Sequence, residues 1–408
     1  MSTLTLDEPL ALPPQAEEPR ISQPAPETHV ASVAVKDVAL ARLPSLDGWR
    51  ALSIILVLGA HTVLASGFPK HLTFLFHQLF DGLLGVRFFF VISGLLITWL
   101  MLGEEQKMLK VSLPNFYARR ALRILPVYMA FLLVAAVLQY YTACDHHLTT
   151  WIANLTFTRN FFPGDNTITE HLWSLAVEEQ FYLLWPFVFV ALPRSARTRI
   201  MPFILTGTIL VAIVCRCLWM HRMSDSPIER SLFQQWSFFN NIDSLTIGCI
   251  ASIWLASDSG GLRAFLTSRK LLVFSVGILM ILEPKAAFWL ADRPWMPSAL
   301  KEVAWASSFY LGRTTQSAGF VMLVLQSIML PSWGLYRCLN WRPVAALGVL
   351  SYSLYIWQQV FYHNPATFGL TDPWWMSYPL WLVPAFTAAI ISYHFLEKPF
   401  FKLRHHFR

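Results

Sequence analysis

The chain has 408 residues, of which 55% are hydrophobic and only 13% are charged, and its formal net charge is +7. Soluble globular proteins carry about 25% charged residues, so this composition excludes an ordinary soluble domain. The positive charge does not require a nucleic-acid partner, because no basic run is interleaved with aromatic residues. The five cysteines show neither the spacing of metal ligands nor a disulfide framework, so no metal site is expected.

Residues 1–43 form an acidic, proline-rich segment that cannot supply a hydrophobic core, which predicts a disordered cytoplasmic tail. Ten apolar stretches follow, each about 20 residues long, which is the length that crosses a bilayer. Their expected limits are 48–66, 84–102, 121–141, 172–192, 201–220, 237–256, 270–290, 313–332, 343–362 and 376–396. We therefore predict an all-α, polytopic integral membrane protein with about ten transmembrane helices. Since few residues follow the last stretch, we expect the chemistry to occur in or at the membrane.

The distribution of basic residues predicts the orientation of these helices. If the N-terminus is cytoplasmic, 20 of the 31 lysines and arginines fall in cytoplasmic segments and eight fall outside. Cytoplasmic loops of membrane proteins are enriched in lysine and arginine. Both termini are therefore predicted to be cytoplasmic, including a short basic end at residues 401–408.

The first apolar stretch carries an arginine, Arg50, and a histidine, His61, eleven residues apart. On an α-helix this spacing brings the two side chains to within ~20° of each other and separates them by roughly 16 Å along the axis. Ionisable groups inside a membrane are costly and usually functional. The pair therefore predicts a site that reaches from one membrane face toward the other.

Counting residues along the helices places further polar groups at the depth of His61, in the outer third of the membrane. These groups are Arg87, Glu178, Glu179 and Asp243. Four helices that contribute ionisable groups at one level favour a polar cavity, and a histidine exchanges protons near neutral pH. The alternative for each residue is a structural ion pair between helices.

A second cluster is predicted at the cytoplasmic face. Arg120 and Arg123 are three residues apart at the start of the third span, so their side chains share one helix face and can grip a phosphate. Arg50 lies at the same membrane face. The alternative is an ordinary topology anchor, but three arginines around one entrance favour anion binding.

Several sequence blocks resemble the membrane-bound acyltransferase-3 family over roughly residues 44–400. The blocks are LDGWR at 46–50 with His61, VRFFFVISG at 86–94, RRALRILP at 119–126, HLWSLAVEE at 171–179, DSLTIG at 243–248, SYSLYIW at 351–357 and EKPF at 397–400. The first four, in this order, are highly specific. The resemblance implies a ten-helix transmembrane domain at 44–400 that transfers an acyl group, often acetyl, from a cytoplasmic coenzyme A thioester to a hydroxyl of an envelope carbohydrate or glycolipid.

The resemblance also implies roles for individual residues. Arg50 and His61 match the family's Arg-x10-His motif, in which the histidine is the essential catalytic group. Arg120 and Arg123 match an Arg-x-x-Arg motif associated with donor binding, Ser93 lies in the Phe-Phe-x-x-Ser-Gly block, and Glu178 matches the acidic position of the Trp-Ser-Leu block. At 358 the family commonly carries histidine, whereas this chain has Gln358, which falls at the depth of His61.

These observations predict an O-acyltransferase in a bacterial inner membrane that uses acetyl-CoA as a co-substrate and needs no permanently bound cofactor. His61 is expected to act as general base, Glu178 or Glu179 to orient its ring, and Arg87 to stabilise the carbonyl oxygen. Glu179, Asp243, Gln358 and Ser93 are expected to line the pocket. An acyl-histidine intermediate is an alternative. A transporter of an anionic substrate and a non-catalytic scaffold are the rival functions.

Overall fold

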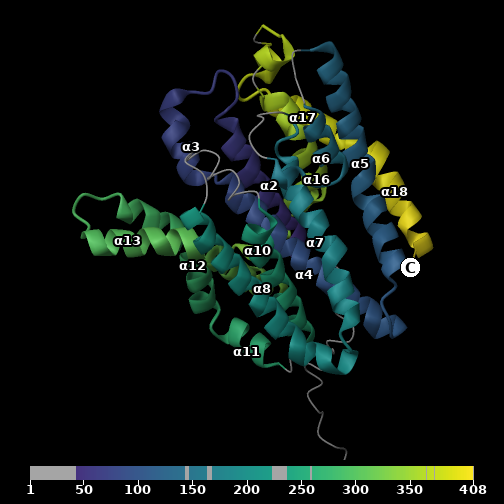
Figure 1. Cartoon of the computed structure of the whole chain (residues 1–408), viewed down its shortest axis with the longest axis vertical. Coiled ribbons are helices and arrows are strands. Elements are labelled where there is room, and N and C mark those ends of the chain that lie inside the picture. Colours follow the sequence, from purple (N-terminus) through teal and green to yellow (C-terminus); the bar gives the residue numbers. More distant parts are fainter. Residues whose placement is uncertain are drawn as a thin grey trace, which may run out of the picture.

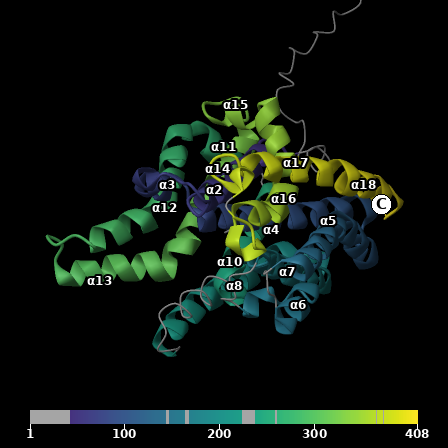
Figure 2. The ribbon, with the colours of Figure 1, turned by 90° about the horizontal axis from the view of Figure 1, so that it is seen from above.

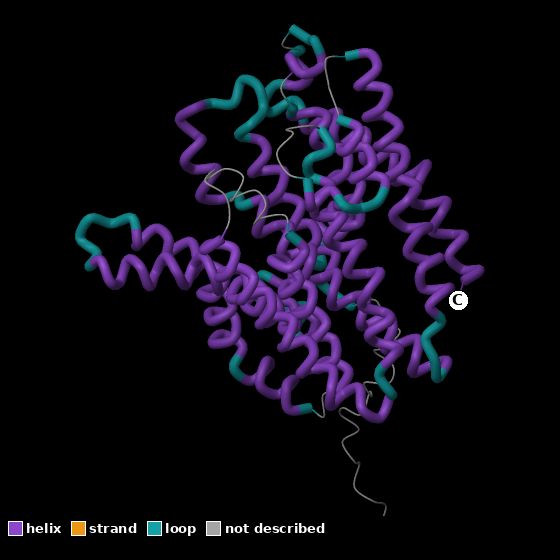
Figure 3. The backbone as a smooth tube through the Cα atoms, in the orientation of Figure 1, coloured by secondary structure: helices purple, strands orange, loops and turns teal. Residues whose placement is uncertain are grey.

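The computed structural model describes residues 43–142, 147–162, 168–222, 237–257, 260–363, 365–371 and 373–407. Within these ranges the regular secondary structure is helical, and no strand is present (Figure 3). The predicted all-α class is therefore confirmed for the described residues. The proline-rich tail lies outside these ranges, except for Leu43, which is buried against the helices. Four cysteines are free thiols, and the fifth, Cys144, also lies outside the described residues.

A helix overlaps each of the ten apolar stretches in the described part of the chain (Figure 1). The helices are α2 (Leu46–Thr62), α4 (Gly82–Met108), α5 (Leu113–Tyr141), α7 (Leu172–Ala191), α8 (Arg194–Arg222), α10 (Phe238–Ser257), α12 (Lys270–Ala291), α14 (Gly312–Met329), α16 (Arg342–Tyr362) and α17 (Leu382–Ser392). The last one begins later than its stretch, because Pro379 lies in a turn and proline has no N–H to donate. Its helical path continues through η6 (Tyr393–Glu397) and α18 (Lys398–Leu403).

Five helical segments of the described chain are long and apolar enough to cross a membrane. The number is six if α10 and α11 (Gly261–Ser268), which are bent relative to each other, count together as one span. The five are 70–108, 113–141, 199–218, 270–291 and 342–362. Other helices are shorter or more polar; α2, for example, has 17 residues. A helix that is surrounded by other helices need not be apolar on every side. This is consistent with α10 and α14, which bury many polar residues and are not counted as separate spans.

Helices α2, α4, α7, α10 and α16 form the centre of the bundle, and α5 and α18 lie together at one side (Figures 1 and 2). On another side, the end of α12 and α13 (Ser298–Ala306) form a hairpin that projects from the bundle in both views. The π-helical segment η3 (Ser307–Leu311) connects α13 to α14. In this arrangement, α2 and α4 contact helices from both halves of the chain.

Helices α4 and α10 pack closely against each other at two glycines. A Cβ atom on Gly94 would lie 1.9 Å from the carbonyl oxygen of Leu245, and one on Gly248 would lie 2.1 Å from that of Val91. Small residues allow membrane helices to touch backbone to backbone. The two glycines thereby fix the position of α4, which carries several of the predicted site residues.

Candidate active site

Most of the predicted site residues line one of two neighbouring cavities; Glu179, Asp243 and Gln358 line neither. We call them the arginine cavity, which Arg50, Arg120 and Arg123 line, and the histidine cavity, which His61 and Arg87 line. Helix α2 reaches both, because Arg50 lies in its first turns and His61 in its last turn. Because of their eleven-residue spacing, these two residues of a single helix therefore lie in different cavities.

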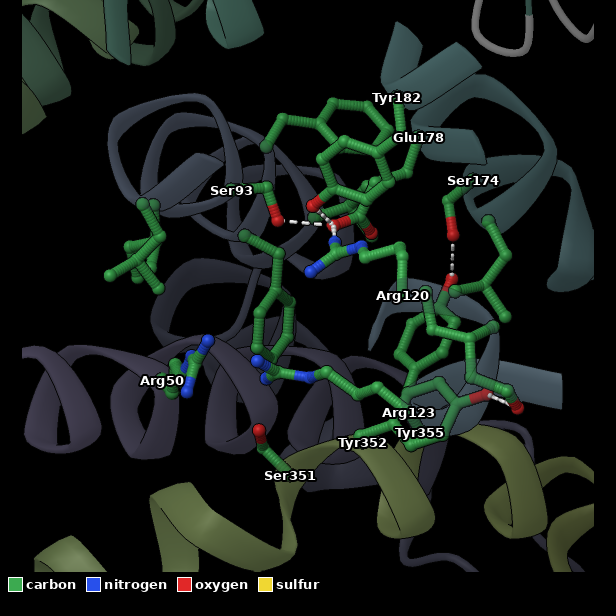
Figure 4. A pocket seen from close by; sticks show the side chains of 17 residues that line it. Arg50, Ser93, Arg120, Arg123, Ser174, Glu178, Tyr182, Ser351, Tyr352 and Tyr355 are labelled. Carbon is green, nitrogen blue, oxygen red and sulfur yellow. Dashed lines mark hydrogen bonds and ion pairs between the residues drawn. The ribbon is translucent and has the colours of Figure 1, made fainter. Parts of the chain in front are cut away.

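The arginine cavity has a volume of about 80 Å³ and gathers three guanidinium groups (Figure 4). Helix α5 supplies Arg120 and Arg123 on adjacent turns, and α2 supplies Arg50. The guanidinium of Arg50 lies 3.6 Å from the Asp47 carboxylate. Arginine is well suited to phosphate recognition because its planar group offers several donors. The structure thus brings together the three arginines that were assigned to one entrance.

A carboxylate organises the polar side of the arginine cavity. Oε1 of Glu178 accepts hydrogen bonds from Ser93 and Tyr182, and it lies 3.4 Å from Nη2 of Arg120 (Figure 4). The guanidinium of Arg120 also lies over the Tyr182 ring, 3.6 Å from its centroid. Glu178 and Tyr182 are four residues apart on α7, so they share one helix face. Tyr182 was not predicted from the sequence, although this spacing was a signal for it.

The expectation that Glu178 or Glu179 orients His61 is wrong. Glu178 binds Arg120 and lines the arginine cavity rather than the histidine cavity. Glu179 lies among the lining residues of neither cavity, and its Oε1 has no hydrogen-bond partner within the described residues. Counting residues along a helix predicts the depth of a side chain in the membrane, but it does not determine which neighbouring helix that side chain faces.

Gln358 holds the His61 ring instead. Oε1 of Gln358 lies 3.1 Å from Nδ1 of His61, and the ring of Tyr362 stacks on the imidazole with centroids 4.7 Å apart and an interplanar angle of 13°. An amide oxygen only accepts hydrogen bonds, so with the Gln358 amide in this orientation the ring hydrogen lies on Nδ1. The lone pair of Nε2 is then available to take a proton. Gln358 was expected to line the pocket, but it is among the lining residues of neither cavity. Tyr362, on the same helix α16, lines the histidine cavity and was not identified from the sequence.

The histidine cavity has a volume of about 840 Å³ and contains charges of both signs. Arg87 lines it, and its guanidinium donates to the Gln316 amide oxygen on α14. The other charged lining residues are Asp81, Glu170, Lys285 and Arg313. The sequence did not single these out: Asp81, Glu170 and Arg313 lie at helix ends or in a connecting segment, and Lys285 lies within α12. Aromatic side chains such as Trp173 and Trp305 also line this cavity, so it offers both apolar and polar contacts.

Asp243 lies outside both sets of lining residues, so its expected place in the pocket is not what the structure shows. Its Oδ2 lies 2.6 Å from Arg216 on α8 and accepts a hydrogen bond of 2.6 Å from Thr314 on α14. Asp243 and Arg216 are fully buried. The alternative interpretation, a structural ion pair between helices, therefore describes Asp243. Buried charges are tolerated when they are paired in this way.

Two side chains, Val86 of α4 and Tyr355 of α16, line both cavities. The arginine and histidine cavities therefore meet at these two residues. Ser93, about two turns further along α4 than Val86, lines only the arginine cavity.

Comparisons with known proteins identify a family for the chain. The family model described as "Acyltransferase domain", of the acyltransferase-3 type, matches residues 43–394. A putative peptidoglycan O-acetyltransferase of Bacillus subtilis is 25% identical over 88% of the chain and 54% of its own length. A peptidoglycan O-acetyltransferase of Listeria monocytogenes is 24% identical over 88% of the chain and 55% of its own length. The chain spans about half the length of these curated relatives. No solved structure matches it.

Proposed function

The chain belongs to the acyltransferase-3 family, and on this basis we propose that it is a membrane O-acetyltransferase. The acetyl group moves from a cytoplasmic acyl-CoA to a hydroxyl of a cell-envelope carbohydrate. Two of its relatives are named as peptidoglycan O-acetyltransferases, so a peptidoglycan hydroxyl is the first acceptor to test. The observation that carries the proposal is that α2 presents Arg50 to one cavity and His61 to the next.

The proposal assigns the arginine cavity to the donor. Coenzyme A carries several phosphates on a long flexible arm, and guanidinium groups bind phosphate well. Arg120 and Arg123 would hold the phosphates, and Arg50 would guide the arm toward the boundary with the histidine cavity. With the donor in the cytoplasm, the arginine cavity faces inward, both termini are cytoplasmic, and about ten helices cross the bacterial inner membrane.

The histidine cavity would receive the carbohydrate, because it is the larger of the two and combines aromatic with charged side chains. Nε2 of His61 takes the proton of the acceptor hydroxyl as its oxygen attacks the thioester carbonyl carbon. The carbon–sulfur bond breaks, the carbon–oxygen ester bond forms, and the proton passes to the departing thiolate of coenzyme A. Gln358 keeps the ring in the orientation that exposes Nε2. Arg87 stabilises negative charge on the carbonyl oxygen.

The test is a comparison of envelope glycans from cells that express the wild-type chain or the His61→Ala variant. Mass spectrometry should detect an added acetyl ester only with the wild-type chain. A His61→Ala variant that still modifies the glycan would contradict the proposal and favour the transporter. Radiolabelled acetyl-CoA, incubated with the purified protein without acceptor, distinguishes the two chemical routes, since stable label on the chain would indicate an acyl-histidine intermediate.

A further inference from the structure

Tyr355 and Val86 occupy a distinctive place, because each of them borders the arginine cavity and the histidine cavity. Both side chains are buried. They come from different helices, Val86 from α4 and Tyr355 from α16. Any group that travels from one cavity to the other along this route passes between an isopropyl group and an aromatic ring.

The Tyr355 side chain is held firmly at this boundary. Its hydroxyl lies 2.5 Å from Oγ of Ser174 and donates a 3.0 Å hydrogen bond to the carbonyl oxygen of His171 (Figure 4 shows the contact with Ser174). The ring makes edge contacts with the rings of His171 and Phe89, at centroid distances of 5.4 and 6.3 Å. Contacts at both the hydroxyl and the ring anchor Tyr355 to α7 and α4. The ring therefore behaves as a fixed wall.

The two cavities differ about tenfold in volume. The arginine cavity has about 80 Å³ of free volume, against about 840 Å³ for the histidine cavity. A donor whose head is bound by Arg120 and Arg123 would have its thioester on the small side of the boundary and His61 on the large side. The acyl group is the first part of such a donor to meet Tyr355 and Val86. Its length then determines whether the carbonyl carbon reaches the imidazole.

We propose that Tyr355 and Val86 form a size-selective boundary that restricts the acyl group to short chains. This inference rests on the proposed function and goes further by naming the residues that set donor specificity. Both residues act by shape, since neither supplies a group that bonds to the reacting atoms. A hydrophobic pocket discriminates against each additional methylene by roughly 10- to 200-fold, so a smaller side chain at either position relaxes the preference.

The experiment uses the full-length protein in lipid vesicles, with peptidoglycan fragments as acceptor and acetyl-, propionyl-, butyryl- or hexanoyl-CoA as donor. The measured quantity is the ratio of the initial rates with butyryl-CoA and acetyl-CoA. Tyr355→Ala should raise this ratio at least about tenfold. Val86→Ala should raise it in the same direction by a smaller factor, and it decides the matter if the Tyr355→Ala protein does not fold.

Two control variants separate ring volume from other effects. Tyr355→Phe keeps the ring and removes the hydroxyl, so its rate ratio should stay within about twofold of wild type, well below the change for a lost side chain. Tyr352→Ala removes a tyrosine from the same helix that lines only the arginine cavity. It should lower the rates with all donors in similar proportion.

Unchanged donor ratios in both Tyr355→Ala and Val86→Ala, with wild-type protein active on acetyl-CoA, would overturn the inference and leave the proposed function intact. A wild-type protein that transfers from none of the four donors would instead overturn the proposed function, and the boundary with it. The two failures are therefore distinguishable by the wild-type rate alone.

Discussion

The two cavities differ in how their central groups are held, and the difference indicates what each can do. In the arginine cavity, Glu178 pairs with Arg120, and Arg50 pairs with Asp47, which is not a lining residue. Three guanidinium groups and one carboxylate line the cavity, so a positive excess remains among the lining side chains for an anion. In the histidine cavity, the ring partners of His61 that the described residues provide are the Gln358 amide and the Tyr362 ring, and both are neutral. The arginine cavity is therefore suited to binding an anion, and the neutral surroundings of the His61 ring are suited to proton transfer.

Replacement of the imidazole should have the largest effect. His61→Ala removes the proton acceptor but leaves the arginine cavity unchanged. We expect kcat to fall by about 10²- to 10⁴-fold, the typical contribution of general base catalysis, with little change in the affinity for acetyl-CoA. Acetyl transfer to peptidoglycan fragments and equilibrium binding of labelled acetyl-CoA measure the two quantities. Loss of donor binding in this variant would contradict the division between the cavities.

Removal of an arginine from the other cavity should show the opposite pattern. Arg120→Ala leaves Glu178 without its ion pair and removes a phosphate ligand, so kcat/KM for acetyl-CoA should fall by about 100-fold, mainly through KM. Arg119→Ala is the matched control. The guanidinium of Arg119 lies 2.5 Å from the Glu104 carboxylate and does not line the arginine cavity. Equal losses in the two variants would contradict a specific role for Arg120.

A smaller effect is expected from the group that orients the imidazole. Gln358→Ala removes one hydrogen bond to His61, which contributes about 0.5–1.5 kcal/mol, so kcat should fall by about two- to thirteenfold. Gln358→His restores the residue that the family resemblance leads one to expect, and it should retain most of the activity. Steady-state rates at fixed pH provide the measurement. A fall in KM for the donor without a change in kcat would not fit this role.

The smallest effect on catalysis should come from the ion pair outside both cavities. Asp243→Asn leaves the buried Arg216 charge unpaired, which costs about 3 kcal/mol of stability, while the activity of the folded protein should change by less than about twofold. Thermal unfolding in detergent, measured beside the transfer rate, separates these outcomes. The double variant Asp243→Asn with Arg216→Met should recover part of the lost stability. A large loss of activity in folded Asp243→Asn would return this residue to the site.

The sequence predicted the helices well, because long apolar runs determine where membrane helices form. It also predicted that Arg50 and His61 serve different levels, since helix geometry fixes their separation. The partners of Glu178 and Asp243 could not be predicted in this way. Their depth follows from counting residues, but the face that each presents depends on how α7 and α10 pack against distant helices. The position of Tyr355 between the two cavities likewise depends on the packing of α16 against α4 and α7.

The backbone contact between α4 and α10 has a consequence for protein engineering. Gly94 and Gly248 leave no room for a side chain, and α4 carries Val86 and Arg87 only two turns away. A library that seeks enzymes for new acyl esters should therefore diversify positions 86 and 355 and keep both glycines constant. Substitution of either glycine by a larger residue would displace helix α4. Variants with altered donor selectivity would then be hard to distinguish from misfolded variants.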